Sequence, residues 1–288
     1  IAFIYFYKFG LFPAILARLF HKKVYFTGGI DALEKSTTNP RDYLLQKYLF
    51  KLCHLFSTNC ILVSKSDADN VRKIYNGMLP ERTSLSFHTI DVENFTNIGL
   101  SEKESIFTTI VWMGSVGNVC RKGVDEALKV YKCLSASKAE YAETKFYIIG
   151  KEGNGTDYLK KLCDELQLHE KVIFTGSIDE EHKINILKRS KYYFQLSTFE
   201  GFGIAALEAL AAKNIVIHSG RGGLNQTIKD YGIKINIEDN IEEQANYIYE
   251  RIPKFDSQKL IEAENYVKNN YSNIKRQKDF EIILNDNR

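Results

Sequence analysis

The sequence is poor in cysteine and histidine, and neither residue type is clustered. Its five cysteines include no Cys-x-x-Cys pair, so they predict reduced, structural thiols and not a disulfide framework. Its six histidines are scattered and show no metal-ligand spacing. We therefore expect a protein of the cytosol without a bound metal.

A long uninterrupted apolar run is also missing. The most apolar stretch, 1–20, is interrupted by two charged residues, a glycine and a proline: Lys8, Gly10, Pro13 and Arg18. A membrane span needs about 20 apolar residues, so the stretch predicts a strand at 2–7 and a helix at 13–20, with Pro13 in its first turn. We find no secretory signal, and because the first residue is isoleucine we expect the chain to begin inside a longer gene product.

Charge of one sign is not in large excess. The chain has 39 basic and 36 acidic residues, a formal net charge of +3. This balance neither requires a nucleic-acid partner nor excludes a weakly basic patch that faces a membrane. With 288 residues, 44% of them hydrophobic, the chain is long enough for about two domains with substantial cores.

The most informative stretch is 191–219. An aromatic run at 192–196 predicts a buried strand, and a turn at 197–203 contains two glycines. A helix is expected at 204–212 and a second strand at 215–217. A glycine-containing turn before a helix offers free backbone N–H groups and the positive end of the helix dipole, so it can hold a phosphate.

Two carboxylates lie in this predicted strand-turn-helix segment. Glu200 is in the turn, and Glu208 follows after seven intervening residues. Helical spacing puts Glu208 on the apolar side of its helix, where an unpaired carboxylate is costly. Its partner could be the hydroxyls of a bound ribose. The alternative is that Glu200 caps the helix and Glu208 pairs with a lysine or arginine of the core.

The order of residues in this stretch resembles a known signature. Glu200-Gly-Phe-Gly-Ile204 followed by Leu207-Glu208-Ala209-Leu210-Ala211 is similar to the Glu-x7-Glu segment of retaining GT-B glycosyltransferases of the family 4 type. The resemblance implies that Glu200 binds the hydroxyls of the donor sugar and Glu208 the ribose. It also implies donor contacts at four residues of the turn: Gly201, Phe202, Gly203 and Ile204.

A second segment of the resemblance surrounds Lys122. A strand expected at 108–113 leads through a turn, 114–123, to a helix from 124 to 134. Lys122 matches the diphosphate-binding lysine of the family, and Gly114 begins the turn. The family usually has arginine at the next position, where this chain has Ser115, and Arg121 is near enough in sequence to supply that charge. The alternative is a solvated basic turn.

Further positions follow from the same resemblance. The nucleotide base is expected against the backbone at Ser177 and Ile178, after the strand 172–176. On the acceptor side we expect Gly28, Gly29 and Asp31, although a Gly-Gly pair also suits a tight turn. An Asp-x-Asp pair at 67–69 is typical of metal-diphosphate sites in the other glycosyltransferase architecture. Here it lies in the first turn of a helix, so capping is the preferred interpretation.

The alternation of strands and helices predicts an α/β protein of GT-B architecture, with two Rossmann-like domains whose parallel sheets face a cleft. We expect an acceptor-side domain at 1–98, a nucleotide-sugar domain at 99–265, and a terminal helix at 266–288 that crosses back to the first domain. Three strands are predicted before residue 98: 2–7, 24–26 and 61–64. We therefore expect a first domain that lacks its opening strands.

The predicted function is retaining glycosyl transfer from a nucleotide-sugar to a cell-surface polysaccharide, lipopolysaccharide or lipid-linked acceptor. No cofactor or metal is expected, since Lys122 and Arg121 would neutralise the diphosphate. The alternatives are a non-catalytic nucleotide-sugar-binding subunit, or a GT-B sugar-nucleotide epimerase or phosphorylase. We expect no nucleic-acid partner, a cytoplasmic location with peripheral membrane contact, and self-association or a partner that covers 1–60.

Overall fold

The structure is a computed structural model, and it describes residues 1–28, 30–35, 38–95, 99–100 and 103–286. The chain forms two compact units, one of Ile1–Thr89 with Asn273–Arg288 and one of Ile90–Ser272. We expected the borders at 98 and 265. They lie at 89 and 272 because Ile90 pairs with Ser272, and the Ile90 N–H donates to the carbonyl of Tyr271.

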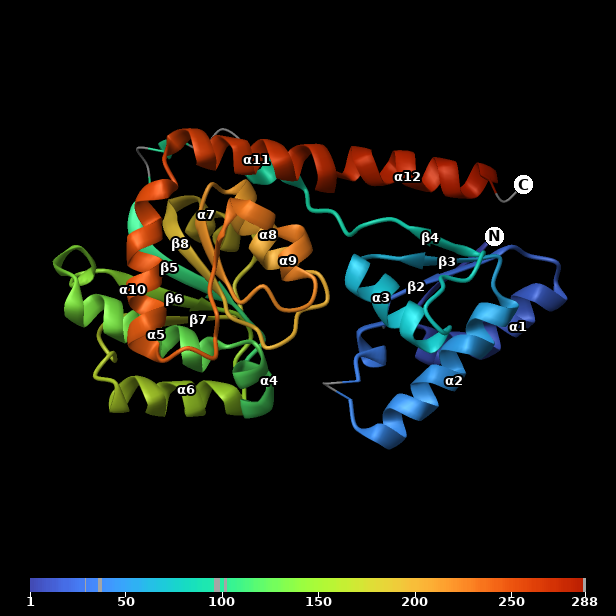
Figure 1. Cartoon of the computed structure of the whole chain (residues 1–288), viewed down its shortest axis with the longest axis horizontal. Helices are drawn as coiled ribbons and strands as arrows, with labels where there is room; N and C mark the ends of the chain where they lie inside the picture. Colours follow the sequence, from blue (N-terminus) through green and yellow to red (C-terminus); the bar gives the residue numbers. More distant parts are fainter. Residues whose placement is uncertain (29, 36–37, 96–98, 101–102, 287–288) are drawn as a thin grey trace. The chain divides into compact units, whose positions relative to one another are not determined.

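The second unit is built on a six-stranded parallel sheet in the order β10-β9-β8-β5-β6-β7 (Figure 1). Its strands are β5 (Glu104–Ile110), β6 (Lys145–Ile149), β7 (Val172–Gly176), β8 (Ser190–Gln195), β9 (Ile215–His218) and β10 (Ile233–Lys234). The central pair is β5 and β8. The strand expected at 108–113 begins four residues earlier and ends at Ile110, because Glu104–Ile110 pairs with both neighbouring strands.

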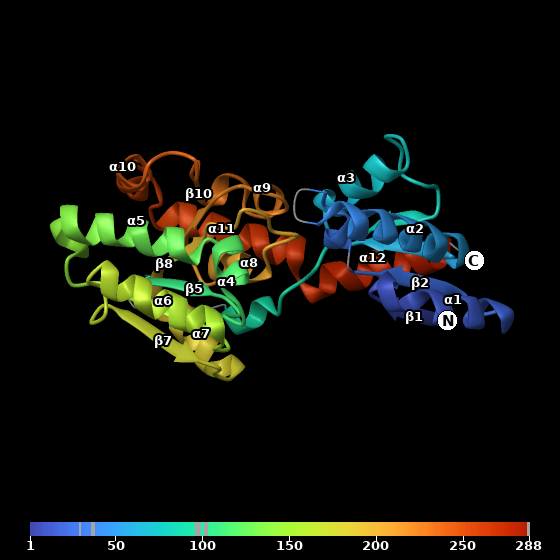
Figure 2. The same ribbon diagram turned by 90° about the horizontal axis from the view of Figure 1, so that it is seen from below.

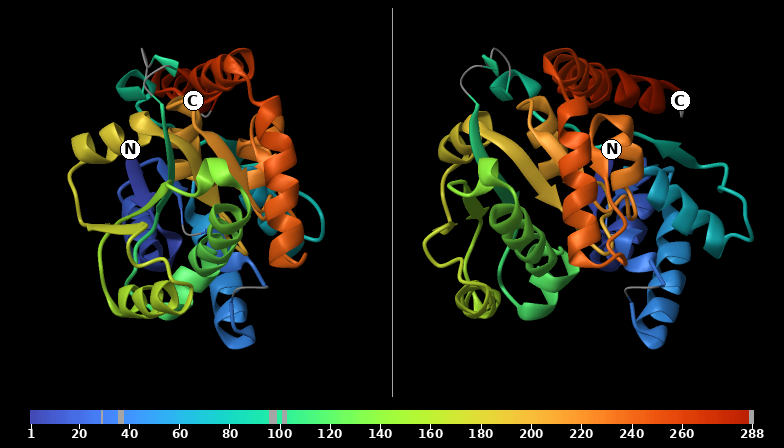
Figure 3. Two further views of the ribbon diagram at one scale, coloured as in Figure 1. Left: turned by 90° about the vertical axis from the view of Figure 1, so that its left-hand side faces the viewer. Right: turned by 60° about the vertical axis from the view of Figure 1, so that its left-hand side comes forward.

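Helices cover both faces of this sheet (Figures 1 and 2). They are α4 (Val116–Arg121), α5 (Val124–Ser137), α6 (Asn154–Glu165), α7 (Glu180–Arg189), α8 (Ile204–Ala211), α9 (Leu224–Thr227), α10 (Ile241–Arg251) and α11 (Ser257–Tyr271). On one face α10 lies beside α5 (Figure 3). Their apolar sides and those of β5, β6 and β8 form one core, in which the ring of Phe107 stacks on those of Tyr192 and Phe194.

The C-terminal region is not one helix. We expected a terminal helix at 266–288, whereas α11 ends at Tyr271 and α12 spans Asn273–Asp286. Ser272, between them, is extended and forms the bridge to Ile90. A residue with extended backbone cannot continue the hydrogen-bond ladder of a helix, so the break belongs to the border between the two units.

The first unit has a four-stranded parallel sheet in the order β1-β2-β3-β4. Its strands are β1 (Ala2–Tyr5), β2 (Val24–Thr27), β3 (Asn59–Leu62) and β4 (Thr83–Leu85), and its helices are α1 (Tyr7–Leu19), α2 (Pro40–Phe56), α3 (Lys65–Ile74) and α12. The expectation of three strands was wrong, because the short, polar strand β4 also pairs with β3. Apolar residues of α1, α2 and α3 pack on one face of the sheet, and Ile283 of α12 packs on the other.

The starts of two helices in this unit can be compared with the predicted helix at 13–20 and with the Asp-x-Asp pair at 67–69. Helix α1 begins at Tyr7, not at Pro13, because Tyr7, Gly10 and Ala14 are buried along one side of it. Helix α3 begins after Ser64, whose hydroxyl accepts from the N–H of Asp67, and the Asp67 carboxylate accepts from the N–H of Val63. Ser64 is therefore the N-cap, and Asp67 lies in the first turn with its carboxylate turned back to the residue before the cap, which agrees with the capping interpretation of the Asp-x-Asp pair.

Candidate active site

The candidate site lies at the carboxyl edge of the second sheet, where Lys122 meets Glu200. The Lys122 Nζ lies 2.6 Å from Oε2 of Glu200, and the two side chains are only 22% and 14% exposed. Oε2 of Glu200 also accepts from Nε2 of Gln195 at 3.2 Å and from the hydroxyl of Ser197 at 3.3 Å. The Tyr193 hydroxyl donates to Oε1 of Gln195. A polar chain therefore runs from inside the sheet to the Glu200 turn.

A close approach of two turns brings this pair together. Gly123 begins α5 with a φ of 66°, and a Cβ there would lie 2.1 Å from the carbonyl oxygen of Leu196. The N–H of Thr198 donates to the carbonyl of Arg121. Glycine at 123 thus lets the end of α4 lie directly on the turn after β8, which places Lys122 beside Glu200.

The turn expected at 114–123 contains a short helix, α4, so that part of the prediction was wrong. Ser115 is its N-cap, and its hydroxyl accepts from the N–H of Asn118. The guanidinium of Arg121 donates to the carbonyl of Phe199 and to the side-chain oxygen of Asn118. Arg121 therefore points toward the Glu200 turn, and Ser115 caps a helix where the family usually has arginine.

The turn between Glu200 and α8 has the local structure that a phosphate site requires. Gly203 starts α8 with a φ of 91°. The ring of Phe202 is buried and meets Tyr271 edge-on, whereas Ile204 is partly exposed. The first backbone N–H groups of α8 have no intrahelical acceptor, so the helix start after Gly203 offers donors to an anion.

A second glycine turn, at Gly222 and Gly223, packs against the Glu200 turn. The carbonyl of Glu200 accepts from the N–H of Gly223 at 2.6 Å. A Cβ at Gly222 would lie 2.2 Å from that same carbonyl oxygen, and one at Gly223 would lie 2.3 Å from the carbonyl oxygen of Gly201. The turns after β8 and β9 are therefore packed backbone against backbone.

Glu208 lies on the buried side of α8 and is paired with Lys183 of α7. The Lys183 ammonium lies 3.0 Å from both carboxylate oxygens of Glu208 and 2.8 Å from Oε1 of Glu180. Burial raises the pKa of Glu208, and the lysine opposes that shift. The structure thus provides the core lysine of the alternative interpretation, and the ribose contact stays a prediction.

The remaining predicted positions lie in parts of the chain other than the Lys122 and Glu200 turns. Ser177 and Ile178 follow β7 at the same edge of the second sheet, just before Asp179 caps α7. In the first unit, Gly28 follows β2 with a φ of 80°, as a tight turn requires, and Asp31 belongs to the short helix Ile30–Leu33. Gly29 lies outside the described residues.

Sequence reasoning missed the polar residues that hold Glu200. Gln195 and Ser197 are buried next to the end of β8, and the turn 219–221 adjoins them. The Ser219 hydroxyl donates to the carbonyl of Ser197 at 2.6 Å and accepts from the N–H of Arg221. Polar residues within an otherwise apolar strand were the available signal.

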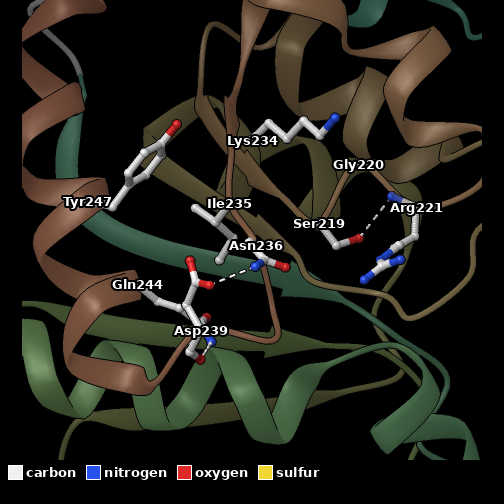
Figure 4. Close-up of a pocket in the computed structure, with 9 residues that line it drawn as sticks. All are labelled: Ser219, Gly220, Arg221, Lys234, Ile235, Asn236, Asp239, Gln244 and Tyr247. Atoms are coloured by element: carbon white, nitrogen blue, oxygen red, sulfur yellow. Dashed lines mark hydrogen bonds between the residues drawn. The ribbon is translucent and has the colours of Figure 1, made fainter.

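A pocket of about 530 Å³ opens beside this second turn (Figure 4). It is lined by Ser219, Gly220 and Arg221 of the turn, by Lys234 at the end of β10 and by Tyr247 of α10. The Arg221 guanidinium is paired with Glu238. In the described ranges, no helix combines the length and the apolar composition that crossing a bilayer requires.

Comparison with protein families identifies the family of this chain. The model of the family described as glycosyl transferases group 1 matches residues 101–271, more than half of the chain. The chain belongs to this family. The match contains the Lys122 turn, the Glu200 turn and the whole of α8, so the group 1 resemblance seen in the sequence is confirmed.

Individual relatives agree with the group 1 assignment. An uncharacterized glycosyltransferase of Methanocaldococcus jannaschii is 29% identical over 181 residues, 62% of this chain and 42% of that protein. The GDP-mannose:cellobiosyl-diphosphopolyprenol alpha-mannosyltransferase of Xanthomonas campestris is 29% identical over 161 residues, 55% of this chain and 39% of that protein. The chain thus spans about two fifths of the length of these curated relatives.

A solved structure confirms the GT-B fold. The crystal structure of Anabaena HepE in complex with UDP and glucose superimposes with a TM-score of 0.78 at 15% identity. The match covers 98% of this group 1 chain and 77% of the Anabaena chain. The expected α/β architecture with two parallel sheets is therefore correct.

Proposed function

We propose that this chain transfers a sugar from a nucleotide-sugar donor to a glycan or lipid-linked acceptor, with retention of the anomeric configuration. The observation that carries the proposal is the Lys122–Glu200 pair beside the first turn of α8. A cation that can meet the donor's diphosphate lies next to a carboxylate that can accept hydrogen bonds from sugar hydroxyls. The helix start adds N–H donors for the same diphosphate.

Two of the similar proteins support the donor class. The Xanthomonas protein is named for GDP-mannose, and the Anabaena protein was solved with UDP and glucose. The shared chemistry is a sugar joined to a nucleoside diphosphate. The proposal therefore names that class, with the base at Ser177 and Ile178, the ribose at Glu208 and the donor sugar at Glu200.

In the proposed reaction, the bond between the anomeric carbon and the diphosphate oxygen breaks. The acceptor hydroxyl oxygen bonds to the same face of that carbon, and its proton passes to the departing diphosphate. Lys122, Arg121 and the N–H groups after Gly203 stabilise the negative charge that develops there. Lys122 has three N–H donors, so it can keep its bond to Glu200 while it binds a phosphate oxygen.

The acceptor side is proposed to work at the inner face of a membrane, on a polysaccharide, lipopolysaccharide or lipid-linked substrate. Helices α1 and α2 of the first unit carry exposed apolar side chains, including Phe9, Phe12 and Leu55. Basic residues lie among them: Lys8, Arg18, Lys47 and Lys51. Apolar and basic residues on exposed helices favour contact with an anionic bilayer surface.

The test begins with a thermal-shift screen of nucleotide-sugars, followed by assays of donor hydrolysis and transfer. We expect Lys122→Ala to lower kcat/KM by about 100-fold or more, the effect of removing one charge-stabilising donor. The matched control is Lys129→Ala, which removes a lysine paired with Glu126 on α5. Equal kcat/KM in the two variants, or no nucleotide-sugar that stabilises the chain, would contradict the proposal.

A further inference from the structure

A second pocket of the second unit has five cations among the eleven residues that line it. It has a volume of about 620 Å³ and lies between β10 and the C-terminal helices of the unit. Its basic side chains are Lys229, Lys234, Arg251, Lys254 and Lys259, and its one carboxylate is that of Asp230. It adjoins the pocket of Figure 4, with which it shares Lys234 and Tyr247.

Aromatic rings hold three of these cations. The Arg251 guanidinium lies 3.5 Å from the ring centre of Tyr247. The Lys229 ammonium lies 4.8 Å from the ring centre of Tyr266, and Lys259 lies at the same distance from Tyr231. Those last two rings are themselves stacked at 4.6 Å. The cations are thus positioned in advance by rings, which attract a cation without cancelling its charge.

Carboxylates hardly neutralise this pocket. Over the described residues, the five cations form a single ion pair, between Lys259 and Glu262 at the long distance of 4.0 Å. Lys234 donates to the neutral side chain of Asn225. Five positive charges against one carboxylate in a shared hollow give a strong local field for an anion.

The pocket is separate from the proposed donor contacts, since none of the residues assigned to the donor lines it. Its volume lies in the range of small-ligand sites. Lysine and arginine together bind phosphate groups well, as point charges and as a planar fork of donors. We propose that this pocket binds a multiply charged phosphate ligand of the diphosphate class, separately from the donor site.

The experiment uses inorganic diphosphate as the probe, with calorimetry at low salt. All variants carry Lys122→Ala, which removes the main diphosphate cation of the proposed donor site, so that failure of that site is not confused with failure of this one. We expect Arg251→Gln with Lys254→Gln to weaken diphosphate binding about tenfold or more, the effect of removing charged hydrogen bonds. Lys254→Gln alone, at an exposed residue, should weaken it severalfold without affecting folding.

The matched control is Lys151→Gln with Lys160→Gln, which removes two positive charges from the same unit outside the pocket. We expect its diphosphate affinity to change less than twofold. Equal weakening by the pocket and control pairs would show a general charge attraction and overturn the proposal. So would the absence of diphosphate binding by the Lys122→Ala chain.

A second arm distinguishes two sources of the same phosphate chemistry. The chain is mixed with vesicles of phosphatidylcholine that contain 30% phosphatidic acid, whose phosphomonoester headgroup carries up to two negative charges, and bound protein is recovered by flotation. Binding that is lost in the pocket pair, kept in the control pair and displaced by inorganic diphosphate would assign a lipid headgroup. Vesicle binding that is equal in both pairs, together with pocket-dependent diphosphate binding, would assign a soluble ligand.

Discussion

His218 is a fully buried residue at the end of β9, and neither of its ring nitrogens has a hydrogen-bond partner among the residues described. Burial, followed by the charge of Lys234, lowers its pKa to about 3. An unfolded histidine has a pKa of about 6.5. Below pH 6.5 the unfolded chain therefore binds a proton that the folded chain does not bind.

This difference predicts an acid-sensitive stability. The stabilising contribution is complete above pH 6.5 and is lost as the pH falls from 6.5 toward 3. Between pH 6.5 and 5 the loss is about 2 kcal/mol, at about 1.4 kcal/mol per pH unit. Urea unfolding at several pH values should show this slope, and the apolar variant His218→Leu should reduce it. A control at the exposed His169, His169→Gln, should leave the slope unchanged.

The variant Glu208→Gln tests whether Glu208 binds a ligand or serves only in a structural ion pair. In Glu208→Gln, Lys183 keeps its second partner, Glu180, at 2.8 Å, so we expect the loss in stability to stay below the about 3–5 kcal/mol that an unpaired buried charge costs. If Glu208 also binds the ribose, nucleotide affinity falls about tenfold. The single tryptophan, Trp112, is 61% exposed and lies against Gly114, so its fluorescence can report the titration. Unchanged affinity in calorimetry would leave Glu208 a structural residue.

At the scale of single residues, the sequence predicted the buried side of Glu208 but not the side chains that contact it. The spacing of Glu208 identified its buried side correctly. Its partner Lys183 comes from a different helix, and the hydrogen bonds of Gln195 and Ser197 to Glu200 depend on how the turn folds back. Such contacts depend on tertiary packing, which local pattern does not contain.

Among the elements, the glycine turns allow a direct test. Gly222 has a φ of 59° and no room for a Cβ against the carbonyl of Glu200. We expect Gly222→Ala to cost about 1–3 kcal/mol of stability and to weaken donor binding, because the Glu200 turn must move. Thermal unfolding and a donor titration measure the two effects.

Gly117 is the matched control for that variant. It lies in α4, and a Cβ there meets no atom within 4 Å. Alanine favours a helix over glycine by about 0.5–1 kcal/mol, so Gly117→Ala should be neutral or slightly stabilising. A Gly222→Ala chain as stable and as tight-binding as Gly117→Ala would refute the packing argument.

The accuracy of the element predictions followed the depth of burial. Strands β8 and β9 were located well because their apolar runs are buried in a sheet covered on both faces. Strand β4 was not counted among the parallel strands of the sheet because Thr83 and Ser84 carry no apolar signal. The start of β5 was misplaced partly because Lys103, before it, is a partly buried lysine. Its ammonium binds the carbonyls of Leu187 and Ser190, which a charge in a linker does not suggest.

Across the whole molecule, the two units differ in how much apolar surface they leave exposed. On α1, Phe9 is 83% and Phe12 is 74% exposed. Large exposed apolar patches mark association sites. We expect the chain to self-associate as its concentration rises, and Phe9→Glu with Phe12→Glu to shift it toward monomer in light scattering. The control Met78→Glu, at an exposed residue in a turn, should not. A wild-type chain that stays monodisperse at all concentrations would contradict the prediction.

The backbone packing of the turns after β8 and β9 has a consequence for how this enzyme family can change. Because the carbonyl of Glu200 leaves no space at Gly222, and that of Gly201 none at Gly223, neither turn can be redesigned alone. A library that varies one turn against a fixed partner should return mostly misfolded clones. Grafting 196–223 as one cassette from a relative would keep the fit, so donor preference should be inherited as a block and not residue by residue.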